Sequence, residues 1–288
     1  MILLTHGGGS NQPDELNARK TKSAAICIDT VNTSLSAIDM VEQAVRALEL
    51  DPIFNAGYGS VVQMDGTIRM DAGICTSKGQ YGAVMQIQNV HNPIQVARAV
   101  MDRGYHSILS GDGATAFARE IGIPSLSPYT EERLLEINDI RTHDIRALTY
   151  DALANDIEST NVKKLSTVGA VAIDNNGMLA AACSTGGTKY CYPGRVGDTP
   201  IYGAGVYCSE YVAVACTGEG DKVLRRLTSK KVEEFYLQTG NLKTACDMAV
   251  QDLWDKEKGY VGIIAVSAKG EYATGNNTYF MASAVRAE

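Results

Sequence analysis

Histidine is scarce in this 288-residue sequence: only four are present, at positions 6, 91, 106 and 143. The sequence also lacks a Gly-x-Ser-x-Gly elbow, the motif that carries the nucleophile of many serine hydrolases. A Ser-His-Asp arrangement therefore has few candidate members. For His6, a loop histidine hydrogen-bonded to backbone is favoured over a catalytic base or a ligand.

Long apolar runs and clusters of basic charge are missing as well. No stretch reaches the ~18 apolar residues of a membrane span, and the apolar residues 1–4 are too few for a signal-peptide core. The net charge is −7, and basic residues form no run longer than a pair, which argues against a nucleic-acid surface. We therefore expect a cytoplasmic protein whose partners include neither membrane nor nucleic acid.

Cysteine occurs seven times, an odd number, and no two cysteines form a Cys-x-x-Cys pair. This pattern disfavours both a disulfide framework and a zinc site. We expect the seven side chains to be mostly buried small hydrophobic groups.

Glycine is abundant, with 28 residues against only 7 prolines, so the excess serves loops and close backbone contacts and does not reflect low complexity. Four glycine-rich segments stand out, at residues 6–10, 55–60, 184–187 and 193–198. None contains the Gly-Lys-Ser/Thr of a phosphate-binding loop, and none fits Gly-x-Gly-x-x-Gly at the start of a helix. The segments therefore disfavour nucleotide binding.

Hydrophobic periodicity predicts strands and helices that come in blocks. Strands are expected at residues 2–5, 82–88, 167–174, 178–184, 211–216, 262–266 and 271–274, with a hairpin at 60–63 and 67–70. Helices are expected at residues 36–50, 93–103, 114–121, 131–146, 222–237 and 242–256. Because strands and helices do not alternate singly, we expect an α+β fold in which helices cover antiparallel sheets.

The polar segment at about residues 150–166 is a linker candidate, and a strand pattern returns abruptly at Thr167. The linker divides the chain into parts of roughly 160 and 120 residues, neither with an obvious core of its own. We therefore expect a single domain over residues 1–288.

Arg195 and Asp198 lie close together in a glycine-rich loop. An arginine fork suits a carboxylate and an aspartate suits an ammonium, so the pair can hold both ends of an α-amino acid. These two residues alone are equally consistent with an ordinary loop salt bridge. Thr167, Thr185 and Thr217 each lie at the edge of an expected strand, where threonine is common for structural reasons.

Several ordered motifs run through the chain. In the second half they are Thr167-Val168-Gly169-Ala170-Val171-Ala172, Ser184-Thr185-Gly186-Gly187, Pro193-Gly194-Arg195-Val196-Gly197-Asp198, Gly203-Ala204-Gly205 and Thr217-Gly218-Glu219-Gly220. In the first half they are His6-Gly7-Gly8-Gly9, Leu48-Glu49, Asp51-Pro52, Phe54-Asn55-Ala56-Gly57-Tyr58-Gly59-Ser60 and Met70-Asp71-Ala72. In their order and spacing these motifs resemble the plant-type L-asparaginase/isoaspartyl peptidase family of N-terminal nucleophile hydrolases, and the resemblance covers nearly the whole chain.

This resemblance implies a four-layer αββα sandwich and a chain that cuts itself between Ser166 and Thr167. Residues 1–166 would form an α subunit and residues 167–288 a β subunit, and two such heterodimers would pair. Thr167 would then carry both the nucleophilic hydroxyl and a free α-amine. An amine of pKa ~7.7–8.0 can serve as the base near neutral pH, so no histidine is needed.

The resemblance also implies roles for residues around the nucleophile. Thr185 would orient the Thr167 hydroxyl, Asn55 would lie beside it, and Thr217 with the Gly218 N–H would form the oxyanion hole.

Substrate binding would fall to Arg195, which takes the α-carboxylate, and to Asp198, which takes the α-ammonium, with Gly218 and Gly220 beside them. No cofactor is implied as a requirement. A structural sodium ion is implied, held by the backbone carbonyls of Leu48, Glu49, Asp51, Phe54, Ala56 and Tyr58.

The reaction that follows from the resemblance is hydrolysis of L-asparagine or of β-aspartyl (isoaspartyl) dipeptides to L-aspartate. Both are small-molecule substrates that share the recognised half. Ordinary α-peptides lack the paired free carboxylate and amine and should be rejected, because the site's charges would go unpaired.

The sequence departs from the family pattern just before the nucleophile, where Ser166 stands in place of the usual glycine or aspartate. Serine tolerates the strained geometry of an N→O acyl shift less readily than glycine. This leaves open slow self-cleavage, or an uncleaved and catalytically silent relative that binds amino acids. A glycosylasparaginase is a second alternative, although it should begin with a signal peptide. Asp221 replaces a frequent glutamate, a mild change.

Overall fold

The computed structural model describes residues 1–10, 16–142, 164–165 and 167–287. Before residue 166 the elements are β1 (Ile2–Ser10), α1 (Leu16–Asp29), α2 (Ala37–Leu50), η1 (Gly57–Gly59), β2 (Met70–Thr76), β3 (Tyr81–Ile87), α3 (Pro93–Arg103), β4 (Ile108–Ser110), α4 (Gly111–Glu120), α5 (Glu131–Thr142) and β5 (Lys164–Leu165). After it they are β6 (Val168–Ile173), β7 (Leu179–Thr185), β8 (Val206–Cys208), β9 (Val212–Gly218), α7 (Gly220–Arg226), α8 (Thr228–Thr239), α9 (Leu242–Glu257), β10 (Val261–Ser267), β11 (Tyr272–Asn276) and β12 (Phe280–Ala287).

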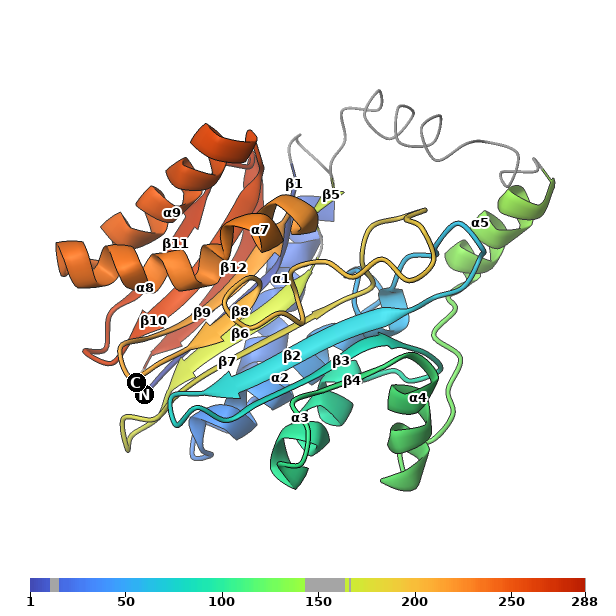
Figure 1. The fold of residues 1–288 in the computed structure, drawn as a ribbon, viewed down its shortest axis with the longest axis horizontal. Coiled ribbons are helices and arrows are strands. Elements are labelled where there is room, and N and C mark those ends of the chain that lie inside the picture. Colours follow the sequence, from blue (N-terminus) through green and yellow to red (C-terminus); the bar gives the residue numbers. More distant parts are fainter. Residues whose placement is uncertain (11–15, 143–163, 166, 288) are drawn as a thin grey trace.

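The larger of two sheets has the strand order β12-β1-β6-β7-β2-β3-β4, and β5 also pairs with β1. Its neighbours are antiparallel except for β3 and β4, which run parallel. Strands from before and after residue 166 interleave in this sheet. The first and last strands are neighbours, with Ile2 opposite Ala287, so the two ends of the chain lie side by side (Figure 1).

The smaller sheet has the order β11-β10-β9-β8 and is antiparallel throughout. Its strands β9 and β10 contact β1, β6 and β7, so the two sheets face each other. Helices α8 and α9 pack on the smaller sheet and α1, α2 and α3 on the larger one, which places helices outside both (Figure 1). Across the described residues, no helix has both the length and the apolar character needed to cross a bilayer.

The larger sheet is buried on both faces, as β6 shows. Val168, Ala170 and Ala172 belong to the core beneath the helices, whereas Val171 and Ile173 belong to the core between the sheets. Successive side chains of a strand point to opposite faces, so burial on both faces explains the continuous apolar run in the sequence. The expected α+β class is confirmed.

The seven cysteines are free and buried, which confirms that they act as small hydrophobic groups. Their burial raises the pKa of the Cys183 thiol, beside the site described below, well above its usual range.

The expected hairpin at residues 60–70 is wrong. The turn itself forms, with the Gly66 N–H donating to the Gln63 carbonyl at 2.9 Å, but the strand begins only at Met70. The Arg69 guanidinium instead donates to the side chains of Gln63, at 2.6 Å, and Asp65, at 3.1 Å. The Gln63 N–H also donates to the Thr67 carbonyl at 3.0 Å, but no strand extends from this bond, and the remaining bonds across the turn are made by side chains.

The helices differ from expectation at three points. Helix α1 was not expected, because its buried positions include the polar Asn17 and Lys20, which weakens the apolar periodicity. The helix expected at 222–237 is divided into α7 and α8 at Leu227, whose φ of 50° is incompatible with a continuous helix. The helix expected at 131–146 is α5 up to Thr142; its remainder, like the linker apart from residues 164–165, lies outside the described residues.

Candidate active site

Two antiparallel strands bring the first two predicted catalytic threonines together. Val168 lies opposite Ser184 in the pairing of β6 with β7, so Thr167, one residue before β6, meets Thr185 at the end of β7. The Thr167 hydroxyl donates to the Thr185 hydroxyl oxygen at 3.2 Å, and both side chains are buried. Ser166, the other half of the predicted cleavage site, lies outside the described residues.

Asn55 is hydrogen-bonded to the segment that follows Thr185. Its side-chain Nδ2 donates to the Gly187 carbonyl at 2.7 Å, and its Oδ1 accepts from Val61 N at 2.9 Å. The Gly186 N–H donates to the Asn55 carbonyl at 2.9 Å, and the Gly187 N–H donates to Thr185 Oγ1 at 3.1 Å. A Cβ on Gly186 would collide with Asn55 Oδ1, so only glycine permits this approach. The loop that carries Asn55 therefore lies against the orienting threonine.

Arg195 and Asp198 converge on Gly220. A Cβ at Gly220 would lie 2.8 Å from Arg195 Nη2 and 2.8 Å from Asp198 Oδ1. The absence of a side chain at Gly220 thus leaves room between Arg195, which can bind an anion, and Asp198, which can bind a cation. Burial raises the pKa of Asp198 to about 7, although the Arg195 charge opposes this, and Asp198 Oδ2 is buried without a hydrogen-bond partner among the described residues.

Thr217 and Gly218 end β9, which packs on both β6 and β7. The Thr217 hydroxyl is buried and, within the described part of the chain, has no hydrogen-bond partner. At Gly218 a Cβ would lie 2.5 Å from the Tyr260 carbonyl oxygen, so the backbone passes closely there. A buried hydroxyl that is unpaired in the protein is available to a ligand.

The predicted sodium loop has carbonyls turned toward its own glycines. The Glu49 carbonyl oxygen would lie 2.5 Å from a Cβ on Gly57, and the Phe54 carbonyl oxygen would clash with one on Gly59. The Glu49 carboxyl points elsewhere: it is buried and accepts from Asn92 Nδ2 at 3.0 Å and from the Ile94 N–H at 3.1 Å. The Leu48, Asp51 and Ala56 carbonyls each accept a backbone N–H within the loop. Backbone carbonyl oxygens are the kind of donor that fits a hard cation.

The sequence interpretation missed the ion pair of Asp221 and misplaced His6. Asp221 Oδ2 lies 2.8 Å from Arg195 Nη2, so the arginine already faces a carboxylate. His6 lies in β1 rather than in a loop, opposite Gly169 and against the Thr167 backbone. Its burial lowers its pKa to about 3, so the ring is neutral near the nucleophile. Neither feature has a sequence signature, because the position of His6 depends on strand pairing and the ion pair depends on how α7 meets the loop of Arg195.

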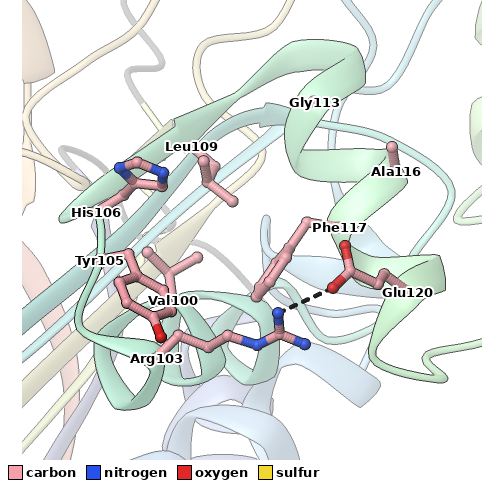
Figure 2. A pocket seen from close by; sticks show the side chains of 9 residues that line it. All are labelled: Val100, Arg103, Tyr105, His106, Leu109, Gly113, Ala116, Phe117 and Glu120. Carbon is pink, nitrogen blue, oxygen red and sulfur yellow. Dashed lines mark hydrogen bonds and ion pairs between the residues drawn. The ribbon is translucent and has the colours of Figure 1, made fainter.

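The pocket in Figure 2 is a separate feature, formed by α3, α4 and the segment between them. The Arg103 guanidinium lies 5.2 Å from the centre of the Phe117 ring and pairs with Glu120 at 2.9 Å. None of the predicted site residues lines this pocket.

Comparison with known proteins gives a consistent answer. A family model described as asparaginase matches residues 1–288. A plant-type L-asparaginase of Pyrococcus horikoshii is 38% identical over 293 residues, which cover 99% of this chain and 95% of the relative. One from Thermococcus kodakarensis is 42% identical over 255 residues, or 86% and 83% of the two chains. An isoaspartyl peptidase/L-asparaginase of Bos taurus is 37% identical over 280 residues, or 94% and 88%.

Proposed function

Because the chain belongs to the asparaginase family, we propose that it is a self-processing threonine amidohydrolase that converts L-asparagine, β-aspartyl dipeptides, or both to L-aspartate. The observation that carries the proposal is the hydroxyl of Thr167 lying 3.2 Å from that of Thr185 at the start of β6. The convergence of Arg195 and Asp198 on Gly220 supports an α-amino acid as the recognised half of the substrate.

Self-processing generates the nucleophile in this proposal. Thr167 Oγ1 attacks the Ser166 carbonyl carbon, its proton is transferred to the departing peptide nitrogen, and the peptide bond becomes an ester. Water then cleaves the ester, leaving a carboxylate on Ser166 and a free α-amine on Thr167. Because no histidine is assigned as the catalytic base, the α-amine of Thr167 takes that role.

Hydrolysis of the substrate follows the same chemistry. The Thr167 α-amine takes the hydroxyl proton while Oγ1 attacks the side-chain carbonyl carbon of the substrate, and Thr185 holds the hydroxyl in place. Thr217 Oγ1–H and the Gly218 N–H stabilise the oxyanion. The leaving amine departs with the proton, and water then hydrolyses the acyl-threonine ester to release L-aspartate.

Recognition rests on charge pairing at Gly220. The Arg195 guanidinium takes the substrate α-carboxylate, and the Asp198 carboxylate takes its α-ammonium. A side chain at Gly220 would occupy the space between these two groups. Asp198 is buried and its Oδ2 has no hydrogen-bond partner among the described residues, so a substrate without a free α-ammonium leaves this group unpaired at an energetic cost. A substrate without a free α-carboxylate leaves Arg195 paired with Asp221 alone.

The proposal extends to the architecture. Two facing sheets with helices outside support a four-layer αββα sandwich of the N-terminal nucleophile type. Interleaving of strands from both parts of the larger sheet would keep segments 1–166 and 167–288 together as one domain after cleavage. We propose that two such heterodimers pair, and that small molecules are the substrates.

A sodium ion in the loop of residues 48–58 is also part of the proposal. It would be held by the backbone carbonyls of Leu48, Glu49, Asp51, Phe54, Ala56 and Tyr58. When bound, a hard cation would interact favourably with the partial negative charges of these carbonyl oxygens and would hold together the loop that carries Asn55. No cofactor is required for the chemistry.

Replacing Thr217 tests the oxyanion hole. In Thr217→Ala we expect kcat for β-aspartyl-leucine to fall about 10²–10³-fold, because one of two donors to the oxyanion is lost. The KM should change little, because Arg195 and Asp198 remain. Thr217→Ser keeps the donor and should retain most of the activity; an equal loss in both variants would contradict the assignment.

The pH dependence of product binding tests Asp198. Its carboxyl must be ionised to accept an α-ammonium, and burial raises its pKa to about 7. Binding of L-aspartate, measured by calorimetry, should therefore weaken as the pH falls below the pKa, approaching about tenfold per pH unit. In Asp198→Asn binding should be weak and the pH dependence that begins near 7 should disappear; burial raises the pKa of Asp71 to about 6, so a remaining change belongs to lower pH. Wild-type affinity that stays constant would contradict the role of Asp198.

A further inference from the structure

A bulge in β3 lies beside the site and has an unusual backbone. Met70 pairs with Ile87 and Ala72 with Val84, so Met85 and Gln86 of β3 together face Asp71 of β2. Gln86 has a φ of 54°, in the left-handed region that side chains other than glycine and asparagine rarely adopt. Bulges of this kind re-aim a side chain, and strained residues concentrate at functional sites.

A buried carboxylate holds this bulge in place. Asp71 Oδ1 accepts the Gln86 N–H at 2.8 Å. Burial raises the pKa of this carboxyl to about 6, and the Arg195 charge and the Gly197 backbone, which lie near it, oppose the rise. Asp71 lies directly opposite Thr185 in the pairing of β2 with β7. The Asp71 carboxyl thus joins the bulge to the loop that carries Arg195.

The bulge aims the Gln86 side chain at the same loop. Gln86 Nε2 donates to the Arg195 carbonyl oxygen at 2.7 Å. Its Oε1 accepts from Gln63 Nε2 at 3.3 Å, and Gln63 in turn accepts from Arg69 at 2.6 Å. The amide is therefore engaged at both ends, and its orientation is fixed. Glycine would relieve the backbone at this position but could not make these bonds.

The position of the Arg195 guanidinium depends on the backbone that these hydrogen bonds hold in place. A Cβ at Gly197 would lie 2.8 Å from Arg195 Nη1, so the arginine side chain folds back over the backbone at Gly197. Gln86 fixes the Arg195 backbone through its carbonyl, and the Asp71 carboxyl lies near enough to interact with the Arg195 charge. The contacts described for Asp71 and Gln86 are all with other residues of the protein, so both act on the substrate through Arg195.

We propose that Asp71 and Gln86 form a bracket that positions Arg195 and thereby sets the affinity for the substrate's α-carboxylate. The proposal rests on the proposed function. Asp71 and Gln86 are positioning residues: they hold the anion binder at the distance from Asp198 that an α-amino acid requires. Small displacements of such a group weaken binding strongly, because charged groups must meet in a fixed geometry.

The variant Gln86→Gly separates positioning from a merely structural role. It removes the amide and relieves the left-handed backbone, while its N–H still reaches Asp71. We expect KM for L-asparagine and β-aspartyl-leucine to rise about tenfold, because the partly buried hydrogen bond that holds the Arg195 backbone is lost. We expect kcat and self-cleavage to stay within about twofold, and the melting temperature to be equal or higher. Gln86→Met, which keeps the length of the side chain, should raise KM similarly.

Asn89→Gly is the matched control. Asn89 is also left-handed, with a φ of 55°, and is exposed in the segment after β3; this variant should leave KM unchanged. An unchanged KM in Gln86→Gly and Gln86→Met, or an equal rise in Asn89→Gly, would overturn the bracket alone. A wild-type protein that neither hydrolyses these substrates nor binds L-aspartate would overturn the proposed function, and the bracket with it.

Discussion

Thr167→Ala should remove both self-cleavage and hydrolysis. The alanine side chain has no oxygen to attack the Ser166 carbonyl, so neither the ester nor the free α-amine can form. Without a nucleophile, aspartate release should fall by at least about a thousandfold, the scale seen when a covalent catalyst loses its attacking group. Intact mass and an aspartate assay on one sample measure both effects.

Thr167→Ser is the control for this prediction. Serine keeps an oxygen at the same position, beside the Thr185 hydroxyl 3.2 Å away, and should still cleave and hydrolyse, although more slowly. Because the Thr167 side chain is buried, either substitution can change the stability of the fold. The melting temperatures of both variants are therefore measured, and their activities are compared where both proteins are folded. A Thr167→Ala protein that is still cut at residue 166 would contradict the mechanism.

Arg195→Ala should spare self-cleavage and cripple substrate binding. No covalent step of the cleavage uses the guanidinium, whereas the substrate α-carboxylate loses its charged partner. Hydrogen bonds to charged groups contribute about 1.5–3 kcal/mol, so KM should rise roughly ten- to a hundredfold. Removal of the charge also raises the pKa of the buried Asp71 and Asp198 further, because Arg195 lowers both.

Arg195→Lys distinguishes charge from geometry. Lysine restores the positive charge but lacks the planar fork that meets a carboxylate through two bonds. We expect a KM between those of the wild type and Arg195→Ala. Steady-state kinetics with L-asparagine, with self-cleavage followed in parallel, give both values. Equal KM values in all three proteins would show that Arg195 does not bind the substrate.

The sequence predicts the parts of the molecule that depend on local pattern. The sequence from Val168 to Ile173 is predicted to be a strand and forms one. It is apolar throughout because the larger sheet is buried on both faces. The ordered motifs around Thr167, Arg195 and Thr217 identify the family because their order and spacing can be read without a fold. Each of these residues is described and buried or half-buried in the structure.

The features that sequence reasoning missed depend on tertiary contacts. Glutamine is not a residue type that favours left-handed backbone, so position 86 carries no local signal; the φ of Gln86 accompanies a hydrogen bond to Asp71, fifteen positions earlier. The Asp221 pair with Arg195 exists because α7 begins where the Arg195 loop folds back. Helix α1 buries Asn17 and Lys20, so hydrophobic periodicity cannot reveal it.

The central claim is that Thr167 becomes an N-terminal nucleophile, and an intact-mass spectrum of purified protein tests it most directly. The protein is incubated over days, and L-asparagine or β-aspartyl-leucine is then added while free aspartate is measured. We predict two fragments, residues 1–166 and 167–288, whose masses sum to that of the chain plus one water, together with aspartate release. A single uncut chain without activity would contradict the account and favour a silent amino-acid-binding protein.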